Sequence, residues 1–316
     1  MNQTSKVYVA GGTTLIGTAI CTLLQRARYQ EVHGGASEPD LTDARDVDAY
    51  FAATKPEYVF LTAGLSGGIA ENLRSPADLI RNNLLVECNV IESAYRHQVR
   101  KLVYLASSCS YPRMSPQPIH EDALLTGPLE PTNEAYAVAK IAGIKLCQAY
   151  RQQFGVNFVV AIPANAFGPA DDFGLEKSHV IAALIRKMHE AKAQHNREVA
   201  IWGSGTPRRE FIFSRDLADA CVFVMANYNG ADPINIGNGF DLSIRALAEA
   251  IRDTVGYTGG LRFDTSKPDG MPRKALDSSK LRRLGWRPQT EFRDALAETY
   301  RWFLGSECDK KELTHA

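Results

Sequence analysis

A tyrosine and a lysine four residues apart, Tyr136 and Lys140, are the side chains of this sequence best suited to proton transfer. On a helix, residues four apart lie on one face, so the phenol and the ammonium can reach the same pocket. A nearby ammonium favours the phenolate and lowers the pKa of the phenol, which suits it to proton transfer near neutral pH. Ser107 follows an apolar stretch at 101–106 and could hold a carbonyl oxygen against that phenol.

A glycine-rich turn near the amino terminus could bind a dinucleotide. Residues 11–17, with glycine at positions 11, 12 and 17, separate an apolar strand at 7–10 from an amphipathic run that ends near Arg26. Strand, glycine turn and helix is the arrangement that places a pyrophosphate on a helix amino terminus. Glycine-rich turns are common, so this motif gains weight from its position between a strand and a helix.

Alternating strand-like and helix-like segments must position these groups. Strand patterns recur at 31–33, 58–63, 102–106 and 158–162, and 78–95 reads as a long helix. Such alternation predicts an α/β fold with a Rossmann-type, doubly wound parallel sheet. Later segments are short and mixed, and they predict a smaller mixed α/β substrate lobe.

The expected domains follow from the change from regular strand–helix alternation to short, mixed segments. Residues 1–165 are expected to form mainly a dinucleotide-binding Rossmann domain, and residues 166–305 mainly a substrate-binding lobe, with some chain crossing back to the sheet. Residues 306–316 are polar and are expected to form a frayed tail.

The composition is that of an ordinary soluble globular protein, with 45% apolar and 23% charged residues. The 36 basic and 36 acidic residues cancel, which argues against a nucleic-acid partner or an anionic membrane surface. Six scattered cysteines lack a C-x-x-C pair or metal-ligand spacing, so we expect no metal and a reducing compartment. No signal peptide and no apolar run of membrane-spanning length is visible, and we expect a cytoplasmic protein.

Several blocks resemble one family of extended short-chain dehydrogenase/reductases, the GDP-L-fucose synthases. The similarity runs along nearly the whole chain, to about Phe303. It is most specific around Cys109 and His179, because generic members of the wider family lack that cysteine and that histidine. The matching blocks are 107–112, 124–136, 140–145, 178–181, 202–207, 209–211, 264–270 and 272–274.

The resemblance implies a 3,5-epimerase/4-reductase that converts GDP-4-keto-6-deoxy-D-mannose to GDP-L-fucose with NADPH. A 4-keto group acidifies the C3 and C5 hydrogens, so a base and an acid on opposite faces can invert each centre. The resemblance gives those roles to Cys109 and His179. It also implies that Tyr136 donates a proton to O4, that Lys140 tunes Tyr136, and that Ser107 orients the carbonyl.

The resemblance also supplies binding residues and a partner. The expected cofactor-binding residues are Gly11, Thr13, Thr14, Leu15, Ile16, Gly17, Asp40, Leu41, Ala63, Tyr136, Lys140, Pro163, Asn165, Ala166 and His179. The expected substrate-binding residues are Ser107, Ser108, Asn165, Lys187, Trp202, Arg209, Lys267 and Arg273. Arginine forks suit a diphosphate, and an indole can cover a base or sugar face, although a solvated basic loop is the plain alternative for 267–274. Family members usually form homodimers through two long helices.

Departures from the family pattern leave alternatives open. Thr14 replaces the middle glycine of the turn, where it could crowd the pyrophosphate or contribute its own hydroxyl. Thr13 and the 34–36 region stand where the family has arginines for the adenosine 2′-phosphate, so NADH is open beside NADPH. Lys187 replaces an arginine, and Gly174 replaces a histidine common in bacterial members. The alternatives are therefore another GDP-4-keto sugar, such as a heptose or dideoxyhexose, and a catalytically silent cofactor-sensing protein.

Overall fold

The computed structural model describes residues 1–174 and 178–314, with side chains as far as Ser306. Its main sheet has six parallel strands in the order β2-β1-β3-β4-β5-β9. This order, with helices on both faces, is the predicted doubly wound arrangement. The strands are β1 (Lys6–Ala10), β2 (Glu31–Gly34), β3 (Tyr58–Leu61), β4 (Lys101–Leu105), β5 (Phe158–Pro163) and β9 (Ile234–Ile236).

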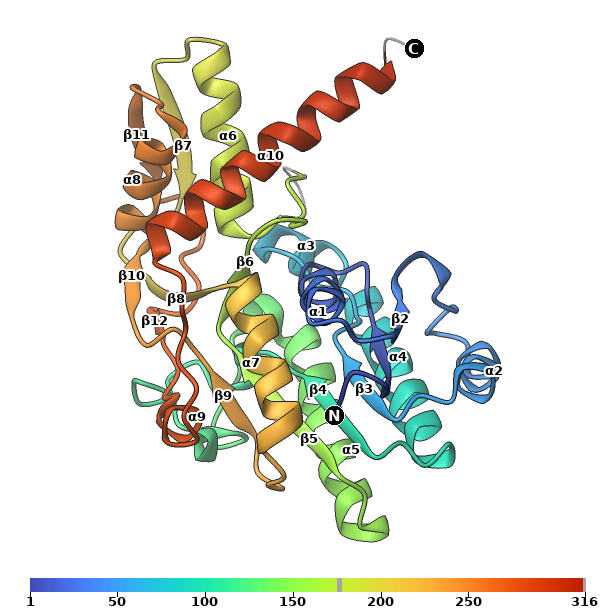
Figure 1. The fold of residues 1–316 in the computed structure, drawn as a ribbon. Helices are drawn as coiled ribbons and strands as arrows, with labels where there is room; N and C mark the ends of the chain where they lie inside the picture. Colours follow the sequence, from blue (N-terminus) through green and yellow to red (C-terminus); the bar gives the residue numbers. More distant parts are fainter. Residues whose placement is uncertain (175–177, 315–316) are drawn as a thin grey trace.

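Helices cover both faces of this sheet, as Figure 1 shows. Helices α1 and α7 pack together on one face, and α2, α4 and α5 pack on the other. Since the inner parallel strands are buried on both sides, their sequences are mainly apolar, and residues 7–10 of β1 are fully buried. The helices are α1 (Leu15–Arg26), α2 (Ala44–Thr54), α3 (Ile69–Arg74), α4 (Pro76–Arg96), α5 (Glu134–Phe154) and α7 (Ser214–Asn227).

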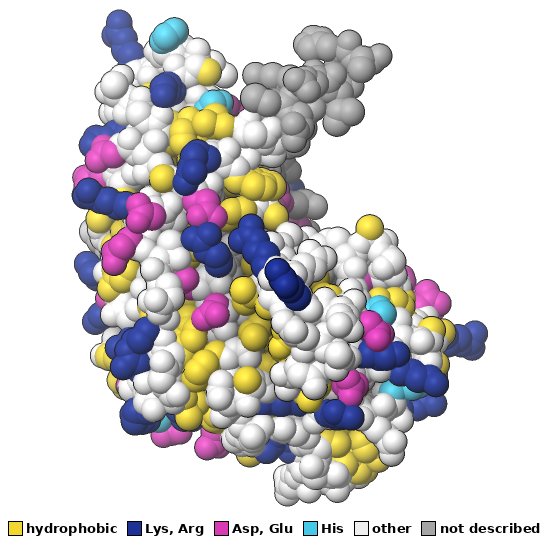
Figure 2. All heavy atoms as spheres, viewed as in Figure 1, with side chains coloured by type: hydrophobic (Ala, Val, Ile, Leu, Met, Phe, Trp, Pro, Cys, Tyr) yellow, Lys and Arg dark blue, Asp and Glu magenta, His cyan; other side chains and the backbone are white. Residues whose placement is uncertain are grey.

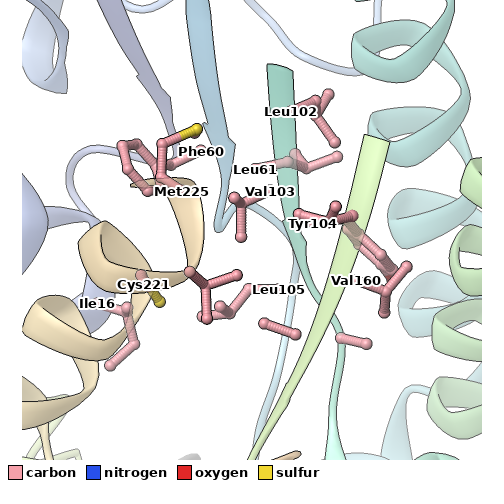
Figure 3. Packing of buried hydrophobic residues seen from close by; sticks show 14 of the residues in the cluster. Ile16, Phe60, Leu61, Leu102, Val103, Tyr104, Leu105, Val160, Cys221 and Met225 are labelled. Carbon is pink, nitrogen blue, oxygen red and sulfur yellow. The ribbon is translucent and has the colours of Figure 1, made fainter. Parts of the chain in front are cut away.

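The core lies between the sheet and its helices. Figure 3 shows Phe60, Val103 and Leu105 of the central strands near Cys221 and Met225 of α7. Because α7 and β9 come late in the chain, this packing shows the second half of the chain crossing back to the sheet. The exact division at residue 165 stays a prediction.

The rest of the second half forms a smaller lobe with its own apolar cluster, which includes Phe167, Met188 and Leu247. One small sheet joins β10, β8, β12 and β6, and a separate pair joins β11 and β7. The elements are β6 (Asn165–Phe167), α6 (Val180–Ala193), β7 (Glu198–Trp202), β8 (Arg208–Phe213), β10 (Asp241–Ser243), α8 (Ile244–Val255), β11 (Gly260–Asp264), β12 (Arg273–Lys274) and α10 (Phe292–Thr314). Helix α9 (Ser279–Arg283) packs against β9 of the main sheet.

Several elements differ from expectation, and among those that were not predicted are the helices α2, α3 and α9. Strand β6 was not predicted, because it is three residues long and pairs with β8 in the lobe instead of with the main sheet. The expectation of a frayed tail at 306–316 is wrong for residues 306–314, which continue α10 as helix. Residues 315 and 316 lie outside the described part of the chain.

On the face drawn in Figure 2, basic and acidic side chains are interspersed and form no large patch of one charge sign. None of the helices that the structure describes is both long enough and apolar enough to cross a membrane.

Candidate active site

The glycine turn between β1 and α1 is tightly built. A Cβ on Gly11, whose φ is +88°, would lie 2.5 Å from the Ala63 nitrogen, and one on Gly17 would lie 1.9 Å from the Gly11 carbonyl oxygen. Both positions therefore require glycine. Thr14 caps α1: its hydroxyl donates to the Gly11 carbonyl (2.7 Å) and accepts from the Gly17 N–H (3.0 Å). The Thr14 hydroxyl thus forms the helix cap, and the turn keeps its shape with threonine in place of the middle glycine.

The acidic side chain that contacts this turn is Glu38. Its carboxylate accepts from the backbone N–H groups of Gly11 (2.7 Å) and Gly12 (3.2 Å). Burial raises the pKa of Glu38, and the two backbone hydrogen bonds oppose that shift. Asp40, which was expected to bind the cofactor, is exposed and accepts from the backbone N–H and the hydroxyl of Thr42. Glu38 is therefore the carboxylate that contacts the turn, and the cofactor-binding role of Asp40 stays a prediction.

The predicted catalytic groups converge where β4 ends. Ser107 follows the strand, and its hydroxyl accepts from the Cys109 N–H at 3.2 Å, which fixes the short turn at 108–110. Tyr136 lies in the first turn of α5, close enough for the charge of Cys109 to raise the pKa of its phenol. Ser107, Cys109 and Tyr136 are thus neighbours, as the motif predicts.

The pKa of Tyr136 is shifted in the direction opposite to the expected one. Burial raises the pKa of the phenol, Cys109 and Glu87 add to that shift, and a hydrogen bond with Ser107 opposes it. Lys140 does not reverse this, because its ammonium lies 5.8 Å from the centre of the Tyr136 ring and is paired elsewhere. The phenol is therefore neutral near pH 7, the form that can donate a proton.

Lys140 is held by a buried carboxylate. Its Nζ lies 3.1 Å from Oε1 of Glu87, and the Tyr104 hydroxyl donates to the same oxygen at 2.7 Å. Lys140 and Glu87 are both buried, with 4% and 1% of their surfaces exposed. A buried charge is tolerated when it is paired and hydrogen-bonded, and this triad meets both conditions.

A pocket of about 310 Å³ opens beside these groups, between the carboxyl ends of the main strands and the smaller lobe. Ligands of open α/β sheets bind at this edge. Among the predicted residues, it is lined by Cys109, Asn165, Ala166, His179, Lys187, Trp202 and Arg209. Ser107, Ser108, Tyr136 and Lys140 do not line it directly, and Cys109 connects them to it.

The Cys109 sulfur accepts hydrogen bonds from two N–H donors. Asn133 Nδ2 lies 3.2 Å and Lys274 Nζ 3.4 Å from Sγ. Desolvation disfavours the thiolate, but Lys274, Ser107 and Arg209 outweigh it and lower the pKa of Cys109. A thiol with a lowered pKa can act as a base near neutral pH.

His179 is the residue before α6 and faces the same pocket as Cys109. Desolvation in the cleft and the Lys274 ammonium lower the pKa of His179, and Asp172 opposes them. The imidazole is therefore largely neutral near pH 7, and it keeps one N–H that can be donated.

The far wall of the pocket is cationic and aromatic. The ammonium groups of Lys187 and Lys267 lie 5.9 Å and 5.3 Å from the centre of the Trp202 ring, which is 45% exposed. Arg209 donates to the backbone carbonyls of Arg208 (2.9 Å) and Asp269 (3.3 Å). An exposed indole between two cations suits a flat, electron-rich base with an attached phosphate.

Arg273 does not line this pocket, in contrast to its predicted role. Its guanidinium forms a bidentate pair with Asp241, at 3.0 Å and 2.8 Å, and it lies at a second pocket behind the strand. Successive side chains of a strand point to opposite faces, so Lys274 takes the position that was expected for Arg273.

Sequence reasoning missed Glu38 as the turn contact, and it missed Glu87 and Asn133. One signal pointed to Glu87: it interrupts the apolar face of α4, which includes Leu79, Val90 and Ile91. A charged residue at such a position is rarely buried without a partner. No comparable local pattern marked Asn133.

Comparisons with known proteins agree with this geometry. The model of the NAD dependent epimerase/dehydratase family matches residues 7–237. GDP-L-fucose synthase 1 of Arabidopsis thaliana is 50% identical over 310 residues, which cover 98% of this chain and 96% of that protein. The solved structure of a C. jejuni GDP-6-OMe-4-keto-L-xylo-heptose reductase superposes with a TM-score of 0.92 at 35% identity, covering 97% of this chain and 99% of that one. A GDP-L-fucose synthetase from Naegleria fowleri bound to NADP superposes with a TM-score of 0.89 at 30% identity, covering 97% and 96%.

Proposed function

The chain belongs to the NAD dependent epimerase/dehydratase family, and within it we propose a nicotinamide-dependent 3,5-epimerase/4-reductase that converts GDP-4-keto-6-deoxy-D-mannose to GDP-L-fucose. One observation carries the proposal. A cysteine with a lowered pKa and a histidine face one pocket, and that cysteine adjoins a neutral tyrosine. Epimerisation requires the cysteine and the histidine, and reduction requires the tyrosine.

Epimerisation is assigned to the two groups in the pocket. The Cys109 thiolate removes the proton from the carbon beside the 4-keto group, and the electron pair moves onto O4 as an enolate. The fraction of His179 that is protonated near neutral pH returns a proton from the other face, so the centre inverts. Solvent then takes the proton from the Cys109 thiol and returns one to His179, and the same pair acts at the other of the two carbons, C3 and C5. A positioned general base of this kind contributes about 10²–10⁴-fold to the rate.

Reduction is assigned to the groups at the end of β4 and the start of α5. The reduced nicotinamide cofactor supplies a hydride for C4 when it is bound. Ser107 orients the carbonyl, and Tyr136 donates its proton to O4 as negative charge develops there. Raising the pKa of Tyr136 keeps the phenol protonated, and Lys140, fixed by Glu87, holds a positive charge beneath it.

The glycine turn fits the pyrophosphate of a dinucleotide. The absence of side chains at Gly11 and Gly17 lets the turn pack closely against Ala63 and against the first turn of α1, so the amino terminus of α1 lies beside the turn. Of the predicted residues, Thr13 lies on this turn, and Leu15 and Ile16 begin α1. Leu41 lies in the loop between β2 and α2, and Ala63 and Pro163 lie at the ends of β3 and β5. We propose NADPH as a cofactor that the protein selects only weakly over NADH.

A second candidate is the same chemistry, or the reduction alone, on another GDP-4-keto sugar. The C. jejuni heptose reductase, whose fold is so similar, favours it. Product analysis by NMR with GDP-4-keto-6-deoxy-D-mannose and each reduced cofactor separates the candidates. We expect GDP-L-fucose. A 4-hydroxy product with unchanged C3 and C5 would favour a reductase, and no turnover of this or a related GDP-4-keto sugar would favour a silent cofactor-binding protein.

We also propose that the protein is a cytoplasmic homodimer that pairs through α4 and α5. An exposed apolar side chain of α5, Val138, which is 41% exposed, supports such a face. Light scattering should give twice the mass of one chain, and a monomer at micromolar concentration would contradict this.

A further inference from the structure

Among the residues that the structure describes, no carboxylate pairs with the buried ammonium of Lys274. The residue is 8% exposed, and within the described part of the chain the hydrogen-bond acceptor of its Nζ is the Cys109 sulfur at 3.4 Å. A buried ammonium without an anionic partner is strongly disfavoured. The group that can supply the missing negative charge is the thiol itself, once it has lost its proton.

The Cys109 sulfur is surrounded by hydrogen-bond donors, as expected around an anion. A neutral thiol is a weak hydrogen-bond acceptor, yet Lys274 and Asn133 both direct N–H donors at Cys109 Sγ. The other charged or titratable groups that face the sulfur are Arg209 and Tyr136. Arg209 already donates to two backbone carbonyls, and Tyr136 is neutral. Lys274 is therefore the principal cation at this sulfur.

The fold fixes the direction of the Lys274 side chain. Strand β12 pairs in parallel with β8, where Lys274 is opposite Arg209. On the other face of β12, Arg273 is clamped by Asp241 of β10. The clamp holds the strand so that the next side chain points into the pocket.

We propose that Lys274 is a positioning residue that holds Cys109 as a thiolate through a buried ion pair and so prepares the base for proton abstraction. This inference deepens the proposed function and rests on it. Desolvation is the main cause of the lowered pKa of His179, and the Lys274 ammonium adds to it.

The test measures the thiol and needs no turnover. The rate of iodoacetamide alkylation at Cys109, followed by peptide mass spectrometry across pH, reports the thiolate fraction. In Lys274→Met, which keeps the length and packing of the side chain, the midpoint should rise by about 1–2 pH units, a 10–100-fold loss of thiolate near neutral pH. Lys274→Arg should retain most of the wild-type midpoint, because it retains the charge.

The control is Lys267→Met, which removes an ammonium at the rim of the same pocket and should leave the midpoint unchanged. Circular dichroism establishes that each variant is folded. An unchanged midpoint in folded Lys274→Met would overturn the inference, even if substrate affinity fell, since Lys274 would then be a substrate contact. An equal rise in Lys274→Arg and Lys274→Met would overturn charge as the cause. Failure of the proposed function itself would appear differently, as the absence of epimerised product with a normal titration.

Discussion

Glu87 and Lys140 form a buried ion pair, with 3.1 Å between Oε1 and Nζ, directly behind the proposed proton donor. The two residues come from α4 and α5, which pack along their lengths. This pair fixes the ammonium, and it explains why Lys140 does not lower the pKa of Tyr136. The pair of Tyr136 and Lys140 is thus joined by a third residue, Glu87.

Removing Glu87 should destabilise the protein more than a surface acid would. In Glu87→Gln the Lys140 charge remains buried without compensation, and breaking a buried pair in this way costs about 3–5 kcal/mol. Glu92→Gln, on the same helix but exposed, should change the free energy of unfolding by less than about 0.5 kcal/mol. Urea denaturation measures both. Equal midpoints for Glu87→Gln and the wild type would show that the pair is not needed for the fold.

Replacement of Tyr136 should remove reduction and leave binding intact. The phenol protonates the developing C4 alkoxide, an interaction that grows in the transition state, so Tyr136→Phe should lower kcat by about 10²–10⁴-fold. Because the acid acts in its protonated form and burial raises the pKa of Tyr136, the phenol should limit the wild-type rate only at strongly alkaline pH. Steady-state kinetics and cofactor titration test this. Unchanged turnover in Tyr136→Phe would exclude the assigned role.

Discrimination between NADPH and NADH should be weak. Thr13 and Ala36 supply no positive charge for a 2′-phosphate, and each missing charge-assisted hydrogen bond removes about 1.5–3 kcal/mol. Two such losses erase more than a hundredfold of preference. The Glu38 carboxylate beside the turn acts in the same direction, so Glu38→Gln should favour NADPH further. Ratios of kcat/KM for the two cofactors decide the point, and a strong NADPH preference in the wild type would contradict it.

Epimerisation and reduction should be separable at Cys109. In Cys109→Ser the shape is nearly kept, but the pKa of the side chain rises far above neutral, and proton abstraction should slow by about 10²–10⁴-fold. Tyr136 remains, so the variant should form the non-epimerised alcohol or stop before reduction. Cys88→Ser, at an exposed cysteine on α4, serves as the matched control. Normal yields of epimerised product from Cys109→Ser would remove the cysteine from the mechanism.

The sequence predicted what depends on local patterns, and the structure added what depends on packing. The strand–turn–helix motif and the parallel sheet follow from periodicity, and Tyr136 and Lys140 share a helix face by spacing alone. Glu87 pairs with Lys140 only because α4 packs on α5, which no local spacing records. Local spacing also could not show that Lys274, and not Arg273, faces the pocket. Successive side chains of a strand point to opposite faces, and the register of β12 on β8 decides which of the two enters the pocket.

Deuterium incorporation by the wild-type protein tests the central claim most directly. GDP-4-keto-6-deoxy-D-mannose is incubated in deuterium oxide with protein and reduced cofactor, and the product is examined by NMR and mass spectrometry. If Cys109 and His179 exchange protons at both carbons, the product carries deuterium at C3 and at C5, and Cys109→Ser and His179→Asn lose that label while cofactor binding is kept. A wild-type product with no deuterium at either carbon would contradict the epimerase assignment and leave a reductase alone.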